Sequence, residues 1–309
     1  MREIVIGTRD SALALWQARW VEQELKKHWP EYSFRVVDIK TKGDKILDVA
    51  LAKIGDKGLF TKELEVKILD REIDLAVHSM KDVPTMLPEG LIIGAMCRRE
   101  DPGDVLVSHK GYRLADLPPG AKVGTSSLRR RAQLLRYRPD FQLYDIRGNL
   151  NTRLAKMEKE DFDGIILAAA GVKRLGWTEK ITDYLSYDVC LPAVGQGSIG
   201  IECRGDDLEV LKIIRVINDQ DAFDGITAER AFLRKLEGGC QIPIGALGEM
   251  EQESMTLHGL VASLDGSTIL RDKITGLRSE ADQLGRTLAD RLIDAGAEKI
   301  LADVREALE

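Results

Sequence analysis

Short apolar runs alternate with helical stretches along the first two thirds of the chain. Residues 4–6 form an apolar run that stops at Gly7, and between Ser11 and His28 the apolar positions recur with the period of a helix. Strands that alternate with helices indicate βαβ units and mostly parallel sheets, so the predicted fold class is α/β. The same alternation predicts further strands at 34–39, 73–77, 105–108, 122–123, 141–145 and 164–168, and helices at 59–69, 128–137 and 150–159.

Two clusters rich in charge, proline and glycine interrupt this alternation, at 98–103 and at 191–197. Such clusters are typical of hinges. Because the chain would cross between lobes at both clusters, we expect two α/β lobes that resemble periplasmic binding proteins. They would be joined by two crossing strands, with a ligand cleft between them. The predicted boundaries are 1–98 plus 195–217 for a discontinuous first domain and 99–194 for the second.

The pattern changes after Asp219. Thr227 is a potential helix N-cap, and Asp265-Gly266 predicts a hairpin turn. A small α+β third domain is therefore expected over 218–309. Its expected elements are helices at 228–236, 281–294 and 298–308 and strands at 257–264 and 267–275.

Charge is distributed unevenly along the 309 residues, although the net charge is only −6. Residues 98–191 hold 17 basic and 13 acidic side chains, and residues 125–153 hold seven arginines against two acids. An acidic protein with one arginine-rich stretch favours a specific anionic ligand over nucleic acid. Arginine also binds a carboxylate through two parallel hydrogen bonds and stays charged when partly buried.

Composition favours a soluble protein of the cytoplasm. Hydrophobic residues make up 44% of the chain and charged residues 31%, as in ordinary globular domains. The longest apolar run, at 165–172, is far shorter than the roughly 20 residues that span a bilayer, and no secretory signal is expected. Four cysteines are too few for a disulfide scaffold, which indicates a reducing compartment.

Two predicted strand-to-helix junctions are suited to binding anions. Residues 7–11 and 124–130 each combine the free N–H groups of a helix start with hydroxyl and arginine side chains. Arg147 follows soon after the second junction, and together these groups predict a site for a ligand with several carboxylates. Ser11 and Ser127 have a simpler alternative role as helix N-caps.

A carboxylate and a thiol are the candidate reactive groups. Asp82 follows the strand at 73–77, so it would lie past the C-terminal end of a parallel strand, where α/β folds bind ligands. It could stabilise a cationic intermediate or pass a proton to a leaving group; the alternative is an exposed loop acid. Cys240, preceded by two glycines, could be a covalent tether or a nucleophile, or an inert loop cysteine. The four histidines lie far apart and no CxxC occurs, so no metal site is expected, and His78 is interpreted as a structural hydrogen-bonding residue.

Several motifs resemble, in order along the chain, the porphobilinogen deaminase family, also called hydroxymethylbilane synthases. The longest are HSMKDVP at 78–84, VGTSSLRR at 123–130, LPAVGQG at 191–197 and EGGCQIPIG at 237–245. Arg9, the stretches at 11–17 and 53–60, and Arg147-Gly148-Asn149 also match. The resemblance therefore covers nearly the whole chain.

This resemblance implies a transferase that joins four porphobilinogen molecules head to tail into hydroxymethylbilane, with release of ammonia at each addition. It implies a dipyrromethane cofactor, made from the substrate and held by a thioether to Cys240, with no metal, and it implies Asp82 as the catalytic residue. The implied cofactor-binding residues are Ser11, Lys81, Thr125, Ser127, Arg129, Arg130 and Arg147. The implied substrate-binding residues are Arg9, Arg147, Arg153 and Arg174, and Lys53 and Lys57 would belong to a mobile loop near the active site.

The resemblance further implies a monomer without nucleic-acid or membrane partners, whose product passes to a uroporphyrinogen-III synthase. The main alternative is a non-catalytic anion-binding module with the same two-lobed architecture. Such a module needs neither Asp82 nor a third domain with Cys240, and reversible binding without ammonia release would favour it. Nucleic-acid binding, a third possibility, would weaken steeply with salt.

Overall fold

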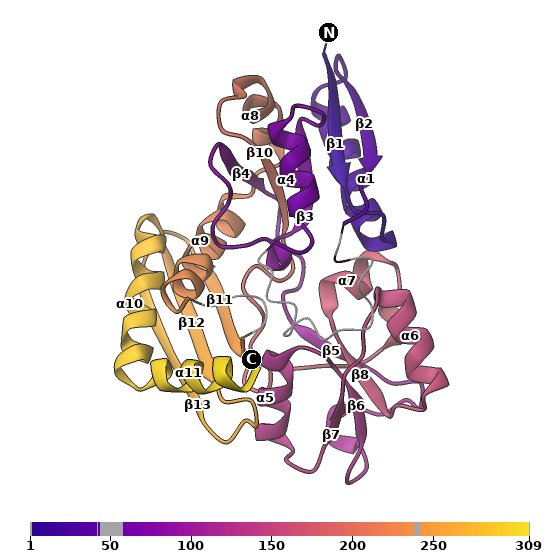
Figure 1. Cartoon of the computed structure of the whole chain (residues 1–309), viewed down its shortest axis with the longest axis vertical. Helices are drawn as coiled ribbons and strands as arrows, with labels where there is room; N and C mark the ends of the chain where they lie inside the picture. Colours follow the sequence, from indigo (N-terminus) through magenta and orange to yellow (C-terminus); the bar gives the residue numbers. More distant parts are fainter. Residues whose placement is uncertain (1, 42, 44–57, 238–241, 309) are drawn as a thin grey trace. The chain divides into compact units, whose positions relative to one another are not determined.

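The computed structural model describes residues 2–41, 43, 58–237 and 242–308 (Figure 1). The chain forms two compact units. The first contains most of the first hundred residues together with Gly197–Phe223, and the second contains Asp101–Gln196 and Asp224–Glu309. The chain therefore leaves and re-enters the first unit at the two predicted hinge clusters. Within the described residues, no helix is both long enough and apolar enough to cross a membrane.

A five-stranded sheet forms the centre of the first unit, in the order β2-β1-β3-β10-β4. Its strands are β1 (Glu3–Thr8), β2 (Ser33–Asp38), β3 (Leu75–Ser79), β4 (Leu91–Met96) and β10 (Ile199–Arg204). β1 pairs in parallel with β2 and β3, whereas β10 lies between β3 and β4 and runs antiparallel to both. The sequence pattern did not predict β4 or β10, because each carries a glycine, Gly94 or Gly200, that weakens the signal of a strand.

Helices cover both faces of this sheet. They are α1 (Ala12–His28), α4 (Lys62–Leu69) and α8 (Leu208–Ile214), with the short 3-10 turns η1 (Met80–Asp82) and η4 (Arg215–Ile217). Val21 of α1 shares an apolar core with Ile4 and Ile6 of β1. Leu64 of α4 belongs to a second core, to which Val5 contributes from the opposite face of the same strand. Each face of β1 is thus buried by a different helix.

The second unit contains another five-stranded sheet, in the order β7-β6-β8-β5-β9. Its strands are β5 (Asp104–Val107), β6 (Lys122–Gly124), β7 (Gln142–Tyr144), β8 (Gly164–Ala168) and β9 (Ile181–Tyr184). β6 pairs in parallel with β7 and β8, whereas β5 lies between β8 and β9 and runs antiparallel to both. Both sheets therefore share one arrangement, in which the antiparallel strand is the first strand after a hinge cluster. The prediction of two α/β lobes is confirmed, with this one reversed strand in each sheet as the difference from the βαβ pattern.

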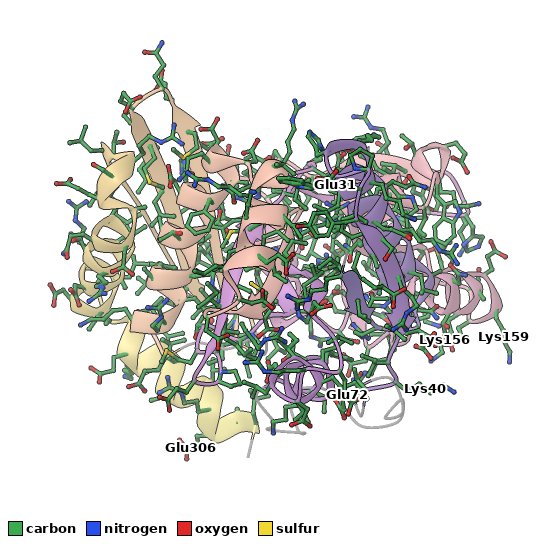
Figure 2. All side chains as sticks on the ribbon, turned by 90° about the horizontal axis from the view of Figure 1, so that it is seen from above. Glu31, Lys40, Glu72, Lys156, Lys159 and Glu306 are labelled. Atoms are coloured by element: carbon green, nitrogen blue, oxygen red, sulfur yellow. The ribbon has the colours of Figure 1, made fainter. Side chains whose placement is uncertain are left out.

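Helices pack on this second sheet, two of them at the predicted ranges 128–137 and 150–159 and a third, at 169–174, that was not predicted. They are α5 (Leu128–Tyr137), α6 (Leu150–Lys159) and α7 (Ala169–Arg174), with the 3-10 turns η2 (Leu114–Asp116) and η3 (Thr178–Lys180). Side-chain oxygens of Ser127 and Asn149 cap the first turns of α5 and α6, which explains why both helices begin where they do. Figure 2 shows long charged side chains, such as those of Lys156 and Lys159 on α6, pointing away from the ribbon.

A small antiparallel sheet, in the order β11-β12-β13, belongs to the C-terminal part of the chain. Its elements are α9 (Gln220–Lys235), β11 (Ile244–Glu251), β12 (Ser254–Ala262), β13 (Ile269–Leu277), η5 (Arg278–Glu280), α10 (Ala281–Asp294) and α11 (Ala297–Leu308). The predicted hairpin is confirmed, and Gly266 adopts a φ of 70° at its turn. The α+β character of this region is therefore as expected, whereas β11 was not predicted.

The predicted helix cap at Thr227 is wrong. α9 begins at Gln220, so Thr227 lies inside the helix. The carboxylate of Asp219 accepts a hydrogen bond from the backbone N–H of Ala222 at 2.8 Å, and aspartate here takes the capping role. The pattern of apolar residues alone did not reveal this earlier start.

Asp104, the first residue of β5, is fully buried and binds two arginines. Its Oδ2 accepts a hydrogen bond from Nη1 of Arg129 at 2.8 Å, and its Oδ1 accepts one from Nη2 of Arg130 at 2.7 Å. The amide of Gln196 donates to the same carboxylate at 2.8 Å. Burial alone would raise the pKa of Asp104, but the two guanidinium charges outweigh burial and hold that pKa well below its usual range. Asp104 thereby ties β5 to α5 and to the hinge cluster at 191–197.

We expect Asp104→Asn to lower the free energy of unfolding by roughly 3–5 kcal/mol, because it leaves two buried guanidinium groups without their counter-charge. Because the pKa of Asp104 is lower in the folded than in the unfolded chain, its contribution is complete at neutral pH and is lost as the pH falls below about 4. Urea unfolding at several pH values measures both effects.

Asp290→Asn is the matched control. Its carboxylate lies 3.1 Å from Nζ of Lys235 and both side chains are about half exposed, so its loss should cost less than about 1 kcal/mol. Equal losses of stability in the two variants would contradict a special role for the buried carboxylate.

Candidate active site

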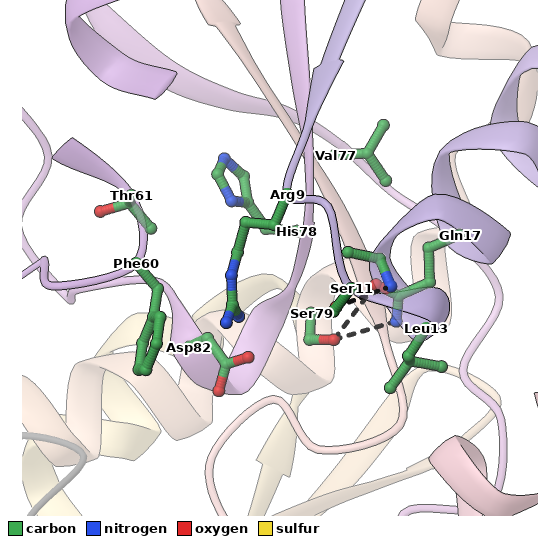
Figure 3. Close-up of a pocket in the computed structure, with 11 residues that line it drawn as sticks. Arg9, Ser11, Leu13, Gln17, Phe60, Thr61, Val77, His78, Ser79 and Asp82 are labelled. Atoms are coloured by element: carbon green, nitrogen blue, oxygen red, sulfur yellow. Dashed lines mark hydrogen bonds between the residues drawn. The ribbon is translucent and has the colours of Figure 1, made fainter. Parts of the chain in front are cut away.

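A cleft opens at the C-terminal ends of β1 and β3, where a parallel sheet of this class binds ligands (Figure 3). Polar side chains line it from three segments of the first unit. Arg9 and Ser11 come from the junction of β1 with α1, and Thr61 comes from the start of α4. His78 and Asp82 come from the end of β3 and from η1. Of the two junctions predicted from the sequence, the one at 7–11 lies here, together with Asp82, which was predicted to follow the strand at 73–77.

Asp82 is held at the cleft by the turn that follows β3. The backbone N–H of Met80 donates to the carbonyl of Ser198 at 3.0 Å, and the N–H of Val83 donates to the carbonyl of Met80 at 3.2 Å. The Met80 side chain is buried, so it anchors the turn in the core. A short, anchored 3-10 turn therefore presents the Asp82 carboxylate to the cleft, in contrast to the alternative of a loose loop acid.

One basic side chain lies on the same side of the cleft as this acid. The guanidinium carbon of Arg9 lies 4.1 Å from the centre of the Phe60 ring, a cation–π contact. Figure 3 shows Arg9, Phe60 and Asp82 together at this side of the cleft. An arginine positioned beside an aspartate can bind a substrate carboxylate while the aspartate faces a cationic group.

The other side of the cleft is built from helix α1. The Ser11 hydroxyl accepts a hydrogen bond from the N–H of Ala14 at 3.3 Å. Ser11 is therefore the N-cap of α1, which was the alternative role expected from the sequence. It also lines the cleft. Nε2 of Gln17 donates to Oγ of Ser79 at 2.9 Å and thereby joins α1 to β3 across the cleft floor. Sequence reasoning missed Gln17, although a glutamine on the apolar stripe of a helix is an unusual polar residue to bury.

The second unit carries the other predicted anion-binding junction. Ser127 caps α5 through a hydrogen bond from the N–H of Arg130 at 3.4 Å, and the hydroxyl of Thr125 accepts a hydrogen bond from the N–H of Ser127 at 3.3 Å. Nε of Arg153 donates to the carbonyl of Gly148 at 2.9 Å. Nη1 of Arg147 is buried and has no hydrogen-bond partner among the described residues, so this guanidinium retains a donor for an anion.

Arg129 and Arg130, which the sequence assigned to ligand binding, form ion pairs and hydrogen bonds inside the protein. Both are buried and both bind Asp104, as described above. Arg129 also donates to the carbonyl of Leu191 at 2.6 Å, and Arg130 to the carbonyl of Ile166 at 2.8 Å. These guanidinium groups therefore have a structural role whether or not a ligand is bound.

The remaining predicted residues are located as follows. Lys81 is in η1, next to Asp82, and Arg174 is the last residue of α7. Cys240, Lys53 and Lys57 lie outside the described residues. Within the described ranges no group of three or more histidine, cysteine or acidic residues is placed to hold a metal ion.

The other three cysteines, Cys97, Cys190 and Cys203, are buried. Burial raises the pKa of Cys190 and that of Cys203 to about 12, so both thiols stay protonated at neutral pH. A protonated thiol is a poor nucleophile, which makes these two cysteines unsuitable as sites of covalent attachment.

The chain matches two family models in order along its length. Residues 4–212 match "Porphobilinogen deaminase, dipyromethane cofactor binding domain", and residues 223–294 match "Porphobilinogen deaminase, C-terminal domain". Among solved structures, a TRAP periplasmic solute binding protein from Desulfovibrio salexigens is 12% identical, with a TM-score of 0.44 over 71% of this chain and 73% of that one.

Curated relatives align from end to end. The porphobilinogen deaminase of Carboxydothermus hydrogenoformans is 58% identical over 304 residues, which cover 98% of each chain. That of Moorella thermoacetica is 58% identical over 305 residues, which cover 99% of this chain and 97% of the relative. With both family models matched and such relatives aligned over nearly their whole length, this chain belongs to the porphobilinogen deaminase family.

Proposed function

We propose that this chain uses Asp82 to join four porphobilinogen molecules head to tail into hydroxymethylbilane, with one ammonia released at each addition. It is a transferase of tetrapyrrole biosynthesis, in keeping with its family. The position of Asp82 supports its assignment as the catalytic residue. It lies on an anchored turn at the end of β3, in a cleft that Arg9 also lines.

Asp82 can serve two steps of one addition. As an acid it can donate a proton to the departing amine. As a carboxylate it can accept hydrogen bonds from a pyrrole N–H and stabilise the azafulvenium cation that remains after ammonia leaves. A single carboxylate near cationic side chains suits this chemistry, because the positive charge on the substrate is transient whereas its carboxylates are permanent.

Arginines would bind the permanent carboxylates. Each porphobilinogen carries an acetate and a propionate group, and the charge accumulates as the chain grows. Two observations support this role: Arg9 of the first unit lines the cleft, and Nη1 of Arg147 in the second unit is buried without a hydrogen-bond partner among the described residues. We assign Arg153 and Arg174 to the same task.

The chain would hold a covalent dipyrromethane through a thioether to Cys240. When bound, this group supplies the primer to which the first substrate unit is joined. The match to a cofactor-binding domain supports the assignment. Nη1 of Arg147, which has no hydrogen-bond partner in the described ranges, fits a group that carries carboxylates. Ser11, Lys81, Thr125 and Ser127 would contribute further hydrogen bonds. Arg129 and Arg130 would add positive charge while they remain bound to Asp104.

The wider setting of the reaction is also a proposal. We infer a monomer of the cytoplasm, without nucleic-acid or membrane partners, whose product passes to a uroporphyrinogen-III synthase. The growing product would be accommodated by movement at the hinge clusters 98–103 and 191–197, together with a loop that carries Lys53 and Lys57. The three domains proposed from the sequence, 1–98 plus 195–217, 99–194 and 218–309, would be the moving parts.

Covalent attachment is tested by intact-mass spectrometry. We expect the purified chain to exceed its sequence mass by two linked pyrrole units, and we expect Cys240→Ala to lose this excess because the thioether cannot form. Cys203→Ala, which alters a buried cysteine, is the control and should keep the excess mass. An unmodified wild-type mass from cells able to make the cofactor would contradict the proposal.

For Asp82→Asn we expect an intact fold and an intact covalent cofactor, but turnover reduced by roughly 10²–10⁴-fold, the usual contribution of a general acid. Ammonia release under saturating porphobilinogen measures this loss. Asp70→Asn, at the exposed end of α4, should turn over normally. Near-normal turnover in Asp82→Asn would show that the catalytic acid lies elsewhere.

A further inference from the structure

Three buried ionisable side chains form a cluster that borders the cleft. His78 on β3 and Glu202 on β10 are 4% and 0% exposed, and Nε2 of the imidazole lies 2.9 Å from Oε2 of the carboxylate. Gly200 lies opposite His78 in the antiparallel register, so Glu202 is the diagonal neighbour of His78 on the same face of the sheet. Glu65 of α4, also buried, lies close enough to both for their charges to shift its pKa.

The environment of this cluster favours a bound proton. Burial is the main cause that raises the pKa of Glu65, and Glu202 raises it further, against a hydrogen bond from Thr61 that lowers it. Oε1 of Glu65 and Oε1 of Glu202 are buried, and neither has a hydrogen-bond partner within the part of the chain that the structure describes. Because a buried charge without a partner is costly, uptake of a proton by these groups lowers the free energy of the cluster.

One member of this cluster, His78, lines the cleft. Asp82 and Thr61, the hydrogen-bond partner of Glu65, line it as well (Figure 3). Asp82 and Arg9 line the cleft together with His78, and the charge of Lys62 on α4 lowers the pKa of Glu65. A proton could therefore enter the cluster from the cleft through the imidazole, while the two glutamates remain away from solvent.

Each addition releases a proton that needs a base. The new carbon–carbon bond joins the methylene carbon of the incoming porphobilinogen to the free α-carbon of the pyrrole that is extended. The carbon–nitrogen bond of the protonated amine breaks with its electron pair going to nitrogen, so neutral ammonia leaves. The α-carbon then loses its hydrogen as a proton, and the electron pair of that C–H bond returns to the ring. No oxidant or reductant takes part.

We propose that His78 is the base that accepts the α-proton, and that Glu202 and Glu65 stabilise the resulting imidazolium until the proton passes to ammonia or water. The inference rests on the proposed function and adds a second acid–base group to it. A carboxylate that holds an imidazole and stabilises its protonated form is a well-established arrangement for a general base. With this base present, Asp82 does not have to accept the α-proton, so after giving its own proton to the departing amine it can stay ionised opposite the substrate cation.

Porphobilinogen deuterated at its free α-carbon provides the direct test. In the wild-type holoenzyme we expect little isotope effect on turnover, because a built-in base makes proton loss fast. In His78→Gln we expect turnover to fall roughly 10²-fold or more, as for loss of a general base, together with a clear primary isotope effect. If His78 had a purely structural role, His78→Gln would lower turnover without a primary isotope effect, because loss of the α-hydrogen would not become the rate-limiting step.

Glu202→Gln separates charge from geometry, since the amide keeps the shape of the carboxylate and one hydrogen-bonding oxygen. Without the negative charge the imidazolium is less favoured, so the acid limb of the pH–rate profile should move to lower pH. The imidazole NMR signal of His78 in the Cys240→Ala protein is a readout that does not depend on activity, and its disappearance in His78→Gln assigns it. Addition of Glu202→Gln to Cys240→Ala should move the titration of this signal to lower pH.

His258→Gln is the matched control, because His258 also pairs with a glutamate, Glu249, at 2.9 Å, but on the β11–β12 hairpin of the second unit. It should leave turnover, isotope effect and pH profile unchanged. Wild-type turnover in His78→Gln, or slow turnover without an isotope effect, would overturn the proposal. Should His78→Gln fail to fold, an unmoved pH profile and NMR titration in Glu202→Gln would overturn it instead. A wild-type protein that releases no ammonia would refute the proposed function itself, which is a separate outcome.

Discussion

The antiparallel pairing of β10 with β3 is the interaction on which the candidate active site depends. It brings the carbonyl of Ser198 to the N–H of Met80 and thereby holds the turn that carries Asp82. It also brings Glu202 to His78. β10 enters the first unit only after the chain has passed through the second. A site that lies at the end of β3 therefore cannot be completed by the first hundred residues alone.

The arginines of this protein have two different roles, and a count of charges along the sequence does not distinguish them. Asp104 neutralises Arg129 and Arg130 in the interior, where an unpaired charge would be costly. Arg147, in contrast, keeps a buried donor without a partner among the described residues. The positive segment at 98–191 thus consists partly of structural arginines and partly of arginines available to an anion. The positive charge that a polycarboxylate ligand would meet is therefore smaller than the count of arginines in this segment indicates, because Asp104 already neutralises part of it.

The sequence predicted those features that depend on local pattern. α5 and α6 match their predicted bounds because an apolar stripe and a capping residue both mark them. β4 and β10 were missed because a glycine weakens each strand, and α9 starts earlier than expected because Asp219 caps it. Asp82 could be assigned to the end of a strand from the sequence alone.

The pairs that complete the site could not be predicted in this way. His78 and Glu202 are 124 residues apart in sequence, and Gln17 and Ser79 are 62 apart. Only the strand order and register of the sheet bring such residues together. The motifs of the family identified the reaction, whereas the buried partners of the reacting groups became visible only in three dimensions.

A catalyst and a binding protein differ in what happens to porphobilinogen at the Asp82 cleft: a catalyst condenses it with loss of ammonia. The most direct test is the stoichiometry of ammonia and product when the purified wild-type holoenzyme is supplied with porphobilinogen. Four ammonia molecules are expected for each linear tetrapyrrole released. Saturable binding of porphobilinogen with no ammonia and no tetrapyrrole would contradict it and would favour a non-catalytic binding protein.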